Sequence, residues 1–176
     1  MTEPLNDEQR VLQDRNRATV EHFLRCHGLE RASLFTADGY KVLPWTGMGR
    51  PIDMRGQYEL KYNFLINMQI FTQWAWSNVQ VFDTQFPDQF WVECDGEGVI
   101  VSPEPGYEPV YYKNHYLHHF LLEDGKIKEF REFQNAITQV TDAAGEVVPM
   151  PPLGDWKPPV DWVEPADWTP DTTPAA

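Results

Sequence analysis

The sequence predicts one α+β domain, in which helices from the amino-terminal half pack on a curved antiparallel sheet and form a cone. Three observations lead to this prediction. Helical patterns come first, short strand-like runs separated by turn signals follow, and a chain of 176 residues fits a single hydrophobic core. A curled sheet wrapped around a long helix leaves one open mouth, so we expect the ligand site there.

Two helices are expected in the first 71 residues. Residues 7–26 carry five apolar side chains among strong helix formers and end just before Gly28, which suits a helix end. The stretch LFTADG (34–39) is expected to be a brief extended piece ending in a turn, followed by irregular chain. Residues 56–71 contain no proline and are apolar nearly all round the helical wheel, so this helix is expected to be buried on most sides.

About four antiparallel strands are expected between residues 74 and 140, where runs rich in Trp, Val, Phe and Tyr alternate with turn signals. The signals are FPDQ (86–89), DGEG (95–98) and EDGK (123–126). Asp124-Gly125 is the strongest, because a two-residue type I′ turn needs positive φ at both central residues.

The composition changes after residue 147, and eight of the fifteen prolines fall between Pro149 and Pro174. We therefore divide the chain into a domain over residues 1–148 and an extended tail over 149–176. Asp-Trp pairs recur at 155–156, 161–162 and 167–168, and we expect these rings to pack on the body or on a second subunit. The alternatives are a disordered tail and a binding or lid segment.

Charge and cysteine content narrow the class of protein. The net charge of −13 repels phosphate backbones and anionic lipids, so no nucleic-acid or membrane partner is expected. The start of the chain is polar and acidic, and no apolar run approaches the ~20 residues of a membrane span, so we expect a cytoplasmic location. Cys26 and Cys94 are expected to be buried thiols without a disulfide or a zinc ion.

Two amides, Asn63 and Asn67, lie one turn apart on an otherwise apolar face of the second expected helix. Pointed into a cavity, each amide can donate to and accept from a ligand. The alternative is a pair of core amides satisfied by neighbouring backbone groups.

Glu132 is the candidate general acid. A carboxyl group enclosed by aromatic walls has its charged form disfavoured, so it can donate a proton near neutral pH. The alternative is a surface charge paired with Lys128 or Arg131.

The strand face of Glu132 depends on the register of the last hairpin. With an ideal turn at residues 124–125, Glu132 lies opposite Leu117 on the face of His115 and His119, and Tyr112 faces the other way. A β-bulge would reverse this arrangement.

The three histidines of this hairpin, His115, His118 and His119, do not predict a metal site. Only His115 and His119 share a strand face, about 13 Å apart, and no nearby pair of carboxylates completes a ligand set. No phosphate-binding loop, nucleophile elbow or cysteine nucleophile motif is found in the sequence, so neither a cofactor nor covalent catalysis is expected.

Several stretches together resemble one family. They are RNRATVEHFLR (15–25), LFTADG, the Arg55-Gly56 pair, FWVECDGEG (90–98), YYKNHYLHHFLLEDGKIK (111–128) and REFQN (131–135). They are similar to the phenazine-biosynthesis proteins of the A/B type, small dimeric members of the NTF2-like fold, the α+β cone shared by nuclear transport factor 2 and ketosteroid isomerase. The likeness spans residues 15–148 and leaves out the tail.

The resemblance implies a cofactor-independent enzyme, acting as a homodimer, that condenses two aminocyclohexenone carboxylic acids through imine formation. Glu132 matches the family's acid/base glutamate and Tyr112 matches a pocket tyrosine. Arg31 falls where the family has an arginine suited to a substrate carboxylate, because a guanidinium matches a carboxylate in shape.

One departure concerns the second helix, where the family carries a histidine one turn before a serine and this chain carries Asn63 and Asn67. An asparagine amide does not titrate near neutral pH and cannot shuttle a proton. Three hypotheses follow: a condensing enzyme, an impaired homologue that binds a reactive intermediate or pairs with an active copy, and an isomerase or hydratase acting on another ring ketone.

Overall fold

The computed structural model describes residues 4–46 and 49–166. The chain forms three helices and eight strands in these ranges. They are α1 (Asp7–Arg25), α2 (Gly28–Ser33), β1 (Phe35–Leu43), β2 (Ile52–Arg55), α3 (Gly56–Ile70), β3 (Phe71–Asp83), β4 (Gln89–Ile100), β5 (Val110–Glu123), β6 (Lys126–Gln134), β7 (Val140–Thr141) and β8 (Val147–Val148).

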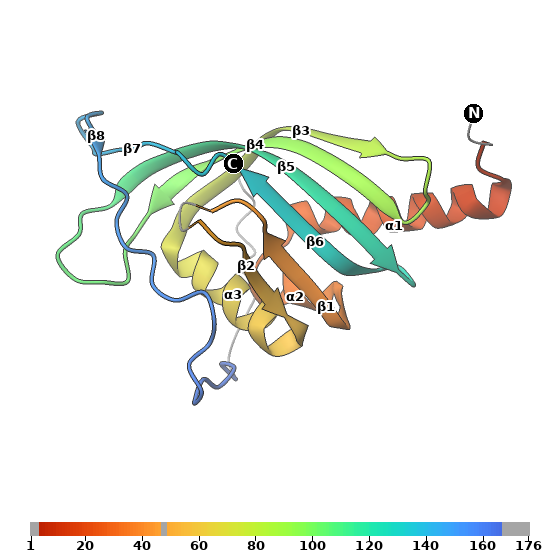
Figure 1. The fold of residues 1–176 in the computed structure, drawn as a ribbon, viewed down its shortest axis with the longest axis horizontal. Helices are drawn as coiled ribbons and strands as arrows, with labels where there is room; N and C mark the ends of the chain where they lie inside the picture. The colour runs from red at the N-terminus through yellow and green to blue at the C-terminus, as the bar shows by residue number, and fades with distance from the viewer. Residues whose placement is uncertain (1–3, 47–48, 167–176) are drawn as a thin grey trace.

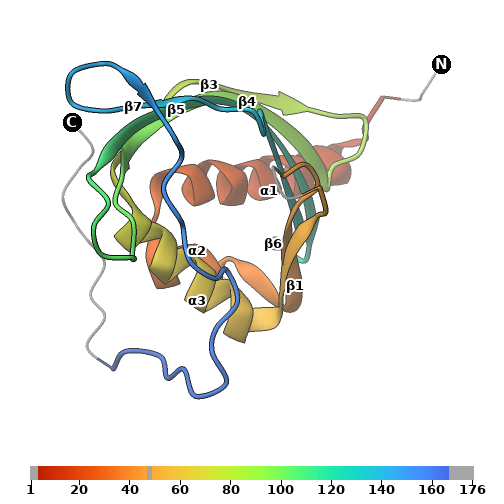
Figure 2. The ribbon, with the colours of Figure 1, turned by 60° about the vertical axis from the view of Figure 1, so that its left-hand side comes forward.

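The strands form one strongly curled sheet in the order β2-β1-β6-β5-β4-β3, and β7 pairs with β5 and β8 (Figure 1). Figure 2 shows this sheet bent around α1, with α2 and α3 completing the wall of a cone. The predicted α+β class is confirmed. The sheet is mixed rather than purely antiparallel, because β1 pairs with β6 in parallel.

Helix α1 supplies the centre of the core. It begins with a capping box, in which the Asn6 side chain accepts from the Gln9 backbone and the Gln9 side chain accepts from the Asn6 backbone. The ring of Phe23 then contacts four other rings of the core, those of Phe35, Phe64, Phe120 and Phe130. Both predicted helices are confirmed, and a short third helix, α2, lies between the first of them and β1.

Two predicted turns are strand interiors instead. The 34–39 stretch does not end in a turn, because β1 continues through Gly39 to residue 43. The DGEG signal at 95–98 is also wrong as a turn, since β4 runs through it to residue 100. Glycine is needed at position 96 for packing: a Cβ there would lie 2.4 Å from the ring of Trp74, 2.7 Å from Trp76 and 2.9 Å from Tyr116.

Replacing Gly96 by Ala is therefore expected to destabilise the fold. The added methyl group overpacks an aromatic cluster, and overpacking costs about 1–3 kcal/mol. Urea unfolding of Gly96→Ala measures the loss, with Ser77→Ala, an exposed site on the neighbouring strand β3, as the control. A variant with wild-type stability would show that the two tryptophan rings move aside freely.

The other two turn signals are confirmed. Residues 84–88 join β3 to β4, and Asp124-Gly125 joins β5 to β6 with φ values of 52° and 81°. The positive φ of both residues is what a type I′ turn requires.

The segment after β8 lies along the body. Trp156 stacks on Phe71 with ring centroids 6.4 Å apart, and Trp162 contacts Tyr58 and Tyr62 of α3 at 5.3 and 5.4 Å. The Tyr58 hydroxyl donates to the Trp162 carbonyl at 3.0 Å. Figure 2 shows the segment running from β8 past α2 and α3. Trp168, the third tryptophan of the repeat, lies outside the described residues.

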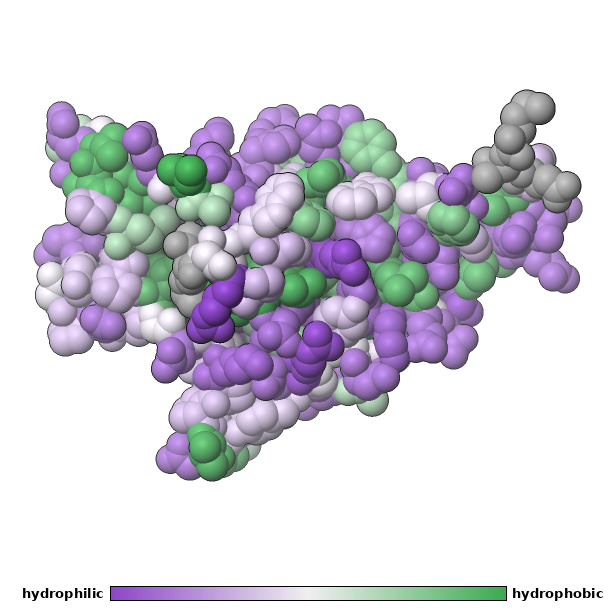
Figure 3. Space-filling view, viewed as in Figure 1, coloured by the Kyte–Doolittle hydropathy of each residue, from purple (hydrophilic) through white to green (hydrophobic). Residues whose placement is uncertain are grey.

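Hydrophilic side chains cover most of the face shown in Figure 3, with separate apolar patches between them. Within the described ranges, no helix is long and apolar enough to cross a membrane. Cys26 and Cys94 are both buried, as predicted.

Candidate functional site

A β-bulge in β6 decides the orientation of Glu132. Leu122 pairs with Ile127, but Leu121 pairs with Glu129, so residue 128 is inserted into the ladder. Glu132 consequently lies opposite His118 and not opposite Leu117. The ideal register was the wrong prediction, and the bulge turns Glu132 toward the interior of the cone.

Glu132 is enclosed and contacts two side chains of the interior. Its side chain is 14% exposed, Oε1 lies 3.4 Å from Nζ of Lys41, and Oε2 lies 3.8 Å from Nε2 of His118. The predicted alternative, pairing with Lys128 or Arg131, is not seen among the described contacts. Those two residues pair instead with other carboxylates, Lys128 with Asp38 and Glu123, and Arg131 with Glu129.

Lys41 and His118 are more deeply buried than Glu132. Burial lowers the pKa of Lys41, and the negative charge of Glu132 opposes this effect. Burial also lowers the pKa of His118 from 6.5 to about 4, again against the effect of Glu132. His118 is therefore a neutral imidazole at neutral pH, beside a lysine and a carboxyl group.

Arg31 reaches the same region from α2. Its Nε donates to the Phe23 carbonyl at 3.1 Å, and its guanidinium carbon lies 4.6 Å from the centroid of the Phe23 ring and 5.8 Å from that of Phe64. Burial lowers the pKa of Arg31, and Cys26 and Glu132 oppose that effect. One terminal nitrogen of the guanidinium is buried without a hydrogen-bond partner among the described residues.

Asn63 and Asn67 lie on α3 and contact each other. The Asn67 Nδ2 donates to the Asn63 Oδ1 at 3.3 Å, and Asn63 is fully buried. The remaining polar atoms, Asn63 Nδ2 and Asn67 Oδ1, are buried without a partner in the described part of the chain. The predicted alternative of backbone-satisfied core amides does not describe these two atoms.

Tyr112 shares the interior face of β5 with His118, but its hydroxyl is already occupied. It lies 2.9 Å from the Tyr116 hydroxyl and accepts from Asn114 Nδ2 at 2.9 Å. Burial raises the pKa of Tyr112, so the phenol stays protonated near neutral pH. Within the described residues no hydrogen bond joins Tyr112 to Glu132, and Tyr112 packs in an aromatic wall with Trp74 and Phe71.

Several interior side chains share one feature, a buried polar atom without a hydrogen-bond partner among the described residues. Buried polar groups in native proteins nearly always have hydrogen-bond partners, so a cluster of unpartnered ones indicates a place where water or a ligand binds. Within the described residues, the atoms of this kind that lie on the interior face of the sheet or on α2 and α3 belong to Arg31, Asn63, Asn67, Trp76 and His118.

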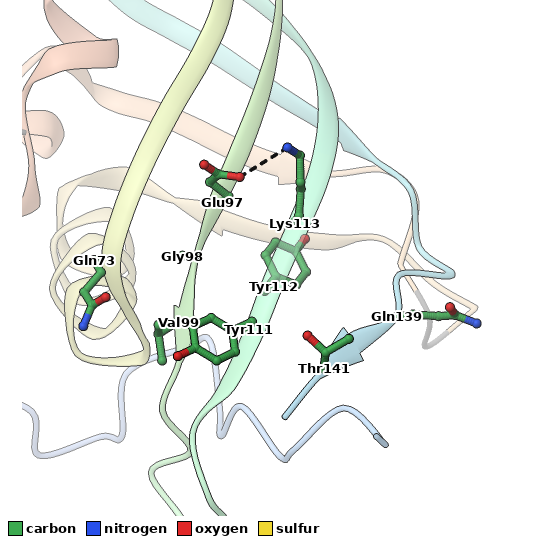
Figure 4. A pocket seen from close by; sticks show the side chains of 9 residues that line it. All are labelled: Gln73, Glu97, Gly98, Val99, Tyr111, Tyr112, Lys113, Gln139 and Thr141. Carbon is green, nitrogen blue, oxygen red and sulfur yellow. Dashed lines mark ion pairs between the residues drawn. The ribbon is translucent and has the colours of Figure 1, made fainter. Parts of the chain in front are cut away.

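A separate hollow of about 340 Å³ lies at the outer ends of β3, β4 and β5 (Figure 4). It contains Tyr112, but none of the other predicted site residues. Its charged groups, Glu97 and Lys113, are exposed and pair with each other at 3.3 Å. A second hollow beside it is lined by His115 and Asn135. Because these groups are exposed or mutually paired, we place the candidate site in the interior around Glu132.

The outward-facing histidines have other roles. His115 is exposed and contacts Asp95 at 2.8 Å and Glu93 at 3.3 Å, and the hydrogen bond to Asp95 raises the pKa of His115. His119 packs on Trp91. No group of three or more His, Cys, Asp or Glu residues in the described ranges could hold a metal ion.

Comparison with known proteins decides the family. The family profile "Phenazine biosynthesis protein A/B" matches residues 3–151. The chain belongs to this family. It is 44% identical over 150 residues to the phenazine biosynthesis protein PhzB of Pseudomonas fluorescens, covering 84% of this chain and 90% of the relative. It is 46% identical over 132 residues to PhzB1 of Pseudomonas aeruginosa, covering 73% and 80%.

Solved structures support the same fold. A phenazine biosynthesis-related protein of Pseudomonas aeruginosa, PhzB2, superposes with a TM-score of 0.68 at 43% identity, covering 73% of this chain and 84% of that one. A putative polyketide cyclase from Xanthomonas campestris matches with a TM-score of 0.57 at 13% identity, over 70% of this chain and 93% of the other. That second likeness shows only the fold.

Two residues of the site, Lys41 and His118, are not predicted from the sequence. Lys41 lies just beyond the predicted 34–39 piece. The strand-like residues 40–43 are the signal that could have extended this piece into a strand carrying Lys41. The pattern of histidines suggests only one role for His118, that of a metal ligand, which the spacing does not support. Its place opposite Glu132 follows from the bulge at residue 128, for which the sequence carries no clear signal.

Proposed function

We propose that this family member is a cofactor-free condensing enzyme of phenazine biosynthesis, which promotes imine formation between amino-ketone cyclohexene carboxylic acids. Family membership supports the role in phenazine biosynthesis. The observation that carries the chemistry is Glu132, an enclosed carboxyl group beside Lys41 and His118.

The chemistry requires a proton donor at one position. An amine adds to a ketone and gives a carbinolamine, which must lose its hydroxyl group before the imine forms. Hydroxide is a poor leaving group, and a carboxylic acid beside it lowers the barrier by protonating it as it leaves. In this proposal Glu132 is that acid, and enclosure of both reactants supplies proximity.

The substrate is held by groups that have no hydrogen-bond partner in the described part of the chain. The free terminal nitrogen of Arg31 donates to a substrate carboxylate, and the amides of Asn63 and Asn67 donate to or accept from its carbonyl and amine groups. Tyr112 serves as an aromatic wall, because its hydroxyl is bound to Tyr116 and Asn114. We further propose a cytoplasmic homodimer, for which sedimentation at micromolar concentration is the test.

The direct test is a condensation assay. A freshly generated aminocyclohexenone carboxylic acid is mixed with the purified chain, and the tricyclic product is followed in a stopped-flow spectrometer. The expected result is a rate well above that of the substrate alone, retained by the surface control His115→Gln. A rate equal to the uncatalysed one, over a range of chain concentrations, would contradict the proposal.

A second candidate, an impaired homologue that holds a reactive intermediate, is favoured by Asn63. Its buried amide can bind a ligand but cannot transfer a proton. Asn63→His separates the two candidates. A large rate gain in the condensation assay would support impaired catalysis in the wild type, and no gain together with tight binding of a product analogue would support a holder of a reactive intermediate.

A further inference from the structure

His118 is the most unusual polar side chain of the interior. It lies on β5, has no exposed surface, and neither ring nitrogen has a hydrogen-bond partner among the described residues. A buried imidazole without partners loses its hydrogen bonds to water and gains none in return, which costs about 1–3 kcal/mol per group. A bound ligand or an ordered water restores these hydrogen bonds.

Aromatic side chains enclose the His118 ring, and one charged side chain, Glu132, lies close to it. Phe130, Trp76 and Tyr116 pack around it, with centroid distances of 5.1, 5.3 and 5.6 Å. Glu132 lies at 3.8 Å, too far for a direct hydrogen bond and close enough for a shared ligand atom or water.

The charged groups that influence His118 come from three elements. Glu132 of β6 favours its protonated form, and Lys41 of β1 and Arg31 of α2 disfavour it. Since burial adds to the effect of the two cations, the ring is neutral, with one N–H donor and one acceptor nitrogen. The side chain of Glu132 is 14% exposed, so solvent reaches this cluster at Glu132.

We propose that His118 is a second catalytic residue, the base that works with the acid Glu132 in the same condensation. This inference rests on the function proposed above. It assigns to β5 the proton transfer that Asn63 of α3 cannot perform.

The step balances within this pair. Glu132 enters the step as the protonated acid and gives its proton to the carbinolamine hydroxyl, the C–O bond breaks, and water leaves. The nitrogen lone pair forms the C=N bond, and His118 takes the proton from that nitrogen. The proton then passes from the His118 imidazolium to the Glu132 carboxylate, either directly after a small movement or through the released water. Both residues return to their starting forms, so the second imine can form in the same way.

The test compares His118→Phe and His118→Gln with His115→Gln, an exposed histidine on the outer face of the same strand. Single-turnover condensation should fall by about 10²-fold or more in both His118 variants, as expected for loss of a general base, and should not change in the control. Thermal unfolding checks that the variants fold. His118→Gln keeps a polar group at this position, so it provides the test if His118→Phe does not fold.

A readout without turnover completes the experiment. With ¹⁵N-labelled histidine, the ring nitrogens of His118 should shift when 2-aminobenzoate, a stable carboxylate-bearing ring, is added, and those of His115 should not. If Glu132→Gln is inactive but His118→Phe keeps a rate within about twofold of wild type, this inference is wrong and the proposed function stands. If the wild type does not condense the substrate, the proposed function fails. If the ring nitrogens of His118 do not shift when 2-aminobenzoate is added, His118 does not contact the ligand and this inference is wrong.

Discussion

Glu132→Gln is expected to lower the single-turnover rate of condensation by about 10²–10⁴-fold, the usual contribution of a positioned general acid. The amide has nearly the shape of the carboxyl group and still accepts from Lys41, but it has no acidic proton to give to the leaving hydroxyl. Because two imines form in sequence, both steps should slow, and the carbinolamine should accumulate. Stopped-flow absorbance of substrate and product measures the rate.

The matched control is Glu93→Gln, which neutralises a carboxylate on the outer face of β4 that pairs with the exposed His115. It should condense the substrate at the wild-type rate. Equal rates for Glu132→Gln and Glu93→Gln would show that Glu132 takes no part in proton transfer.

The second large effect is an acid-dependent loss of stability caused by His118. The pKa of His118 is lowered from 6.5 to about 4 in the folded chain, so below pH 6.5 the unfolded chain takes up a proton that the folded chain refuses. Stability therefore falls as the pH drops from 6.5 toward 4. At about 1.4 kcal/mol per pH unit, the total loss from this residue is about 3 kcal/mol.

Urea unfolding at a series of pH values between 7 and 4 measures this loss. His118→Gln should have a flatter dependence on pH than the wild type, whatever its absolute stability. His115→Gln should not flatten it, because Asp95 raises the pKa of His115 and its protonation favours the folded chain. Parallel curves for wild type and His118→Gln would contradict burial of a neutral imidazole.

The sequence predicts the fold better than the site because periodicity and turn chemistry are local. The helical patterns at 7–26 and 56–71 and the positive-φ pair at 124–125 each depend on neighbouring residues, and all three are confirmed. The DGEG prediction at 95–98 failed because its glycines serve a contact between strands, where Gly96 makes room for the rings of Trp74 and Trp76.

The site depends on long-range pairing, which local patterns do not contain. Lys41 meets Glu132 only because β1, the strand that carries Lys41, pairs in parallel with β6. The sequence predicts only a short extended piece in this region, which ends at residue 39. His118 meets Glu132 only because one residue is inserted at position 128. A shift of one residue exchanges the two faces of a strand, so the same sequence could be assigned either an inward or an outward Glu132.

A crystal structure of the chain with a stable carboxylate-bearing ring, such as 2-aminobenzoate or the tricyclic product, tests the central claim most directly. We expect the ring inside the cone, with its carboxylate at Arg31 and its amino or ring nitrogen within about 3.2 Å of both Glu132 and His118. A ring bound only in the outer hollow beside Gln73 and Tyr111, with the interior side chains unchanged, would contradict an interior acid–base site.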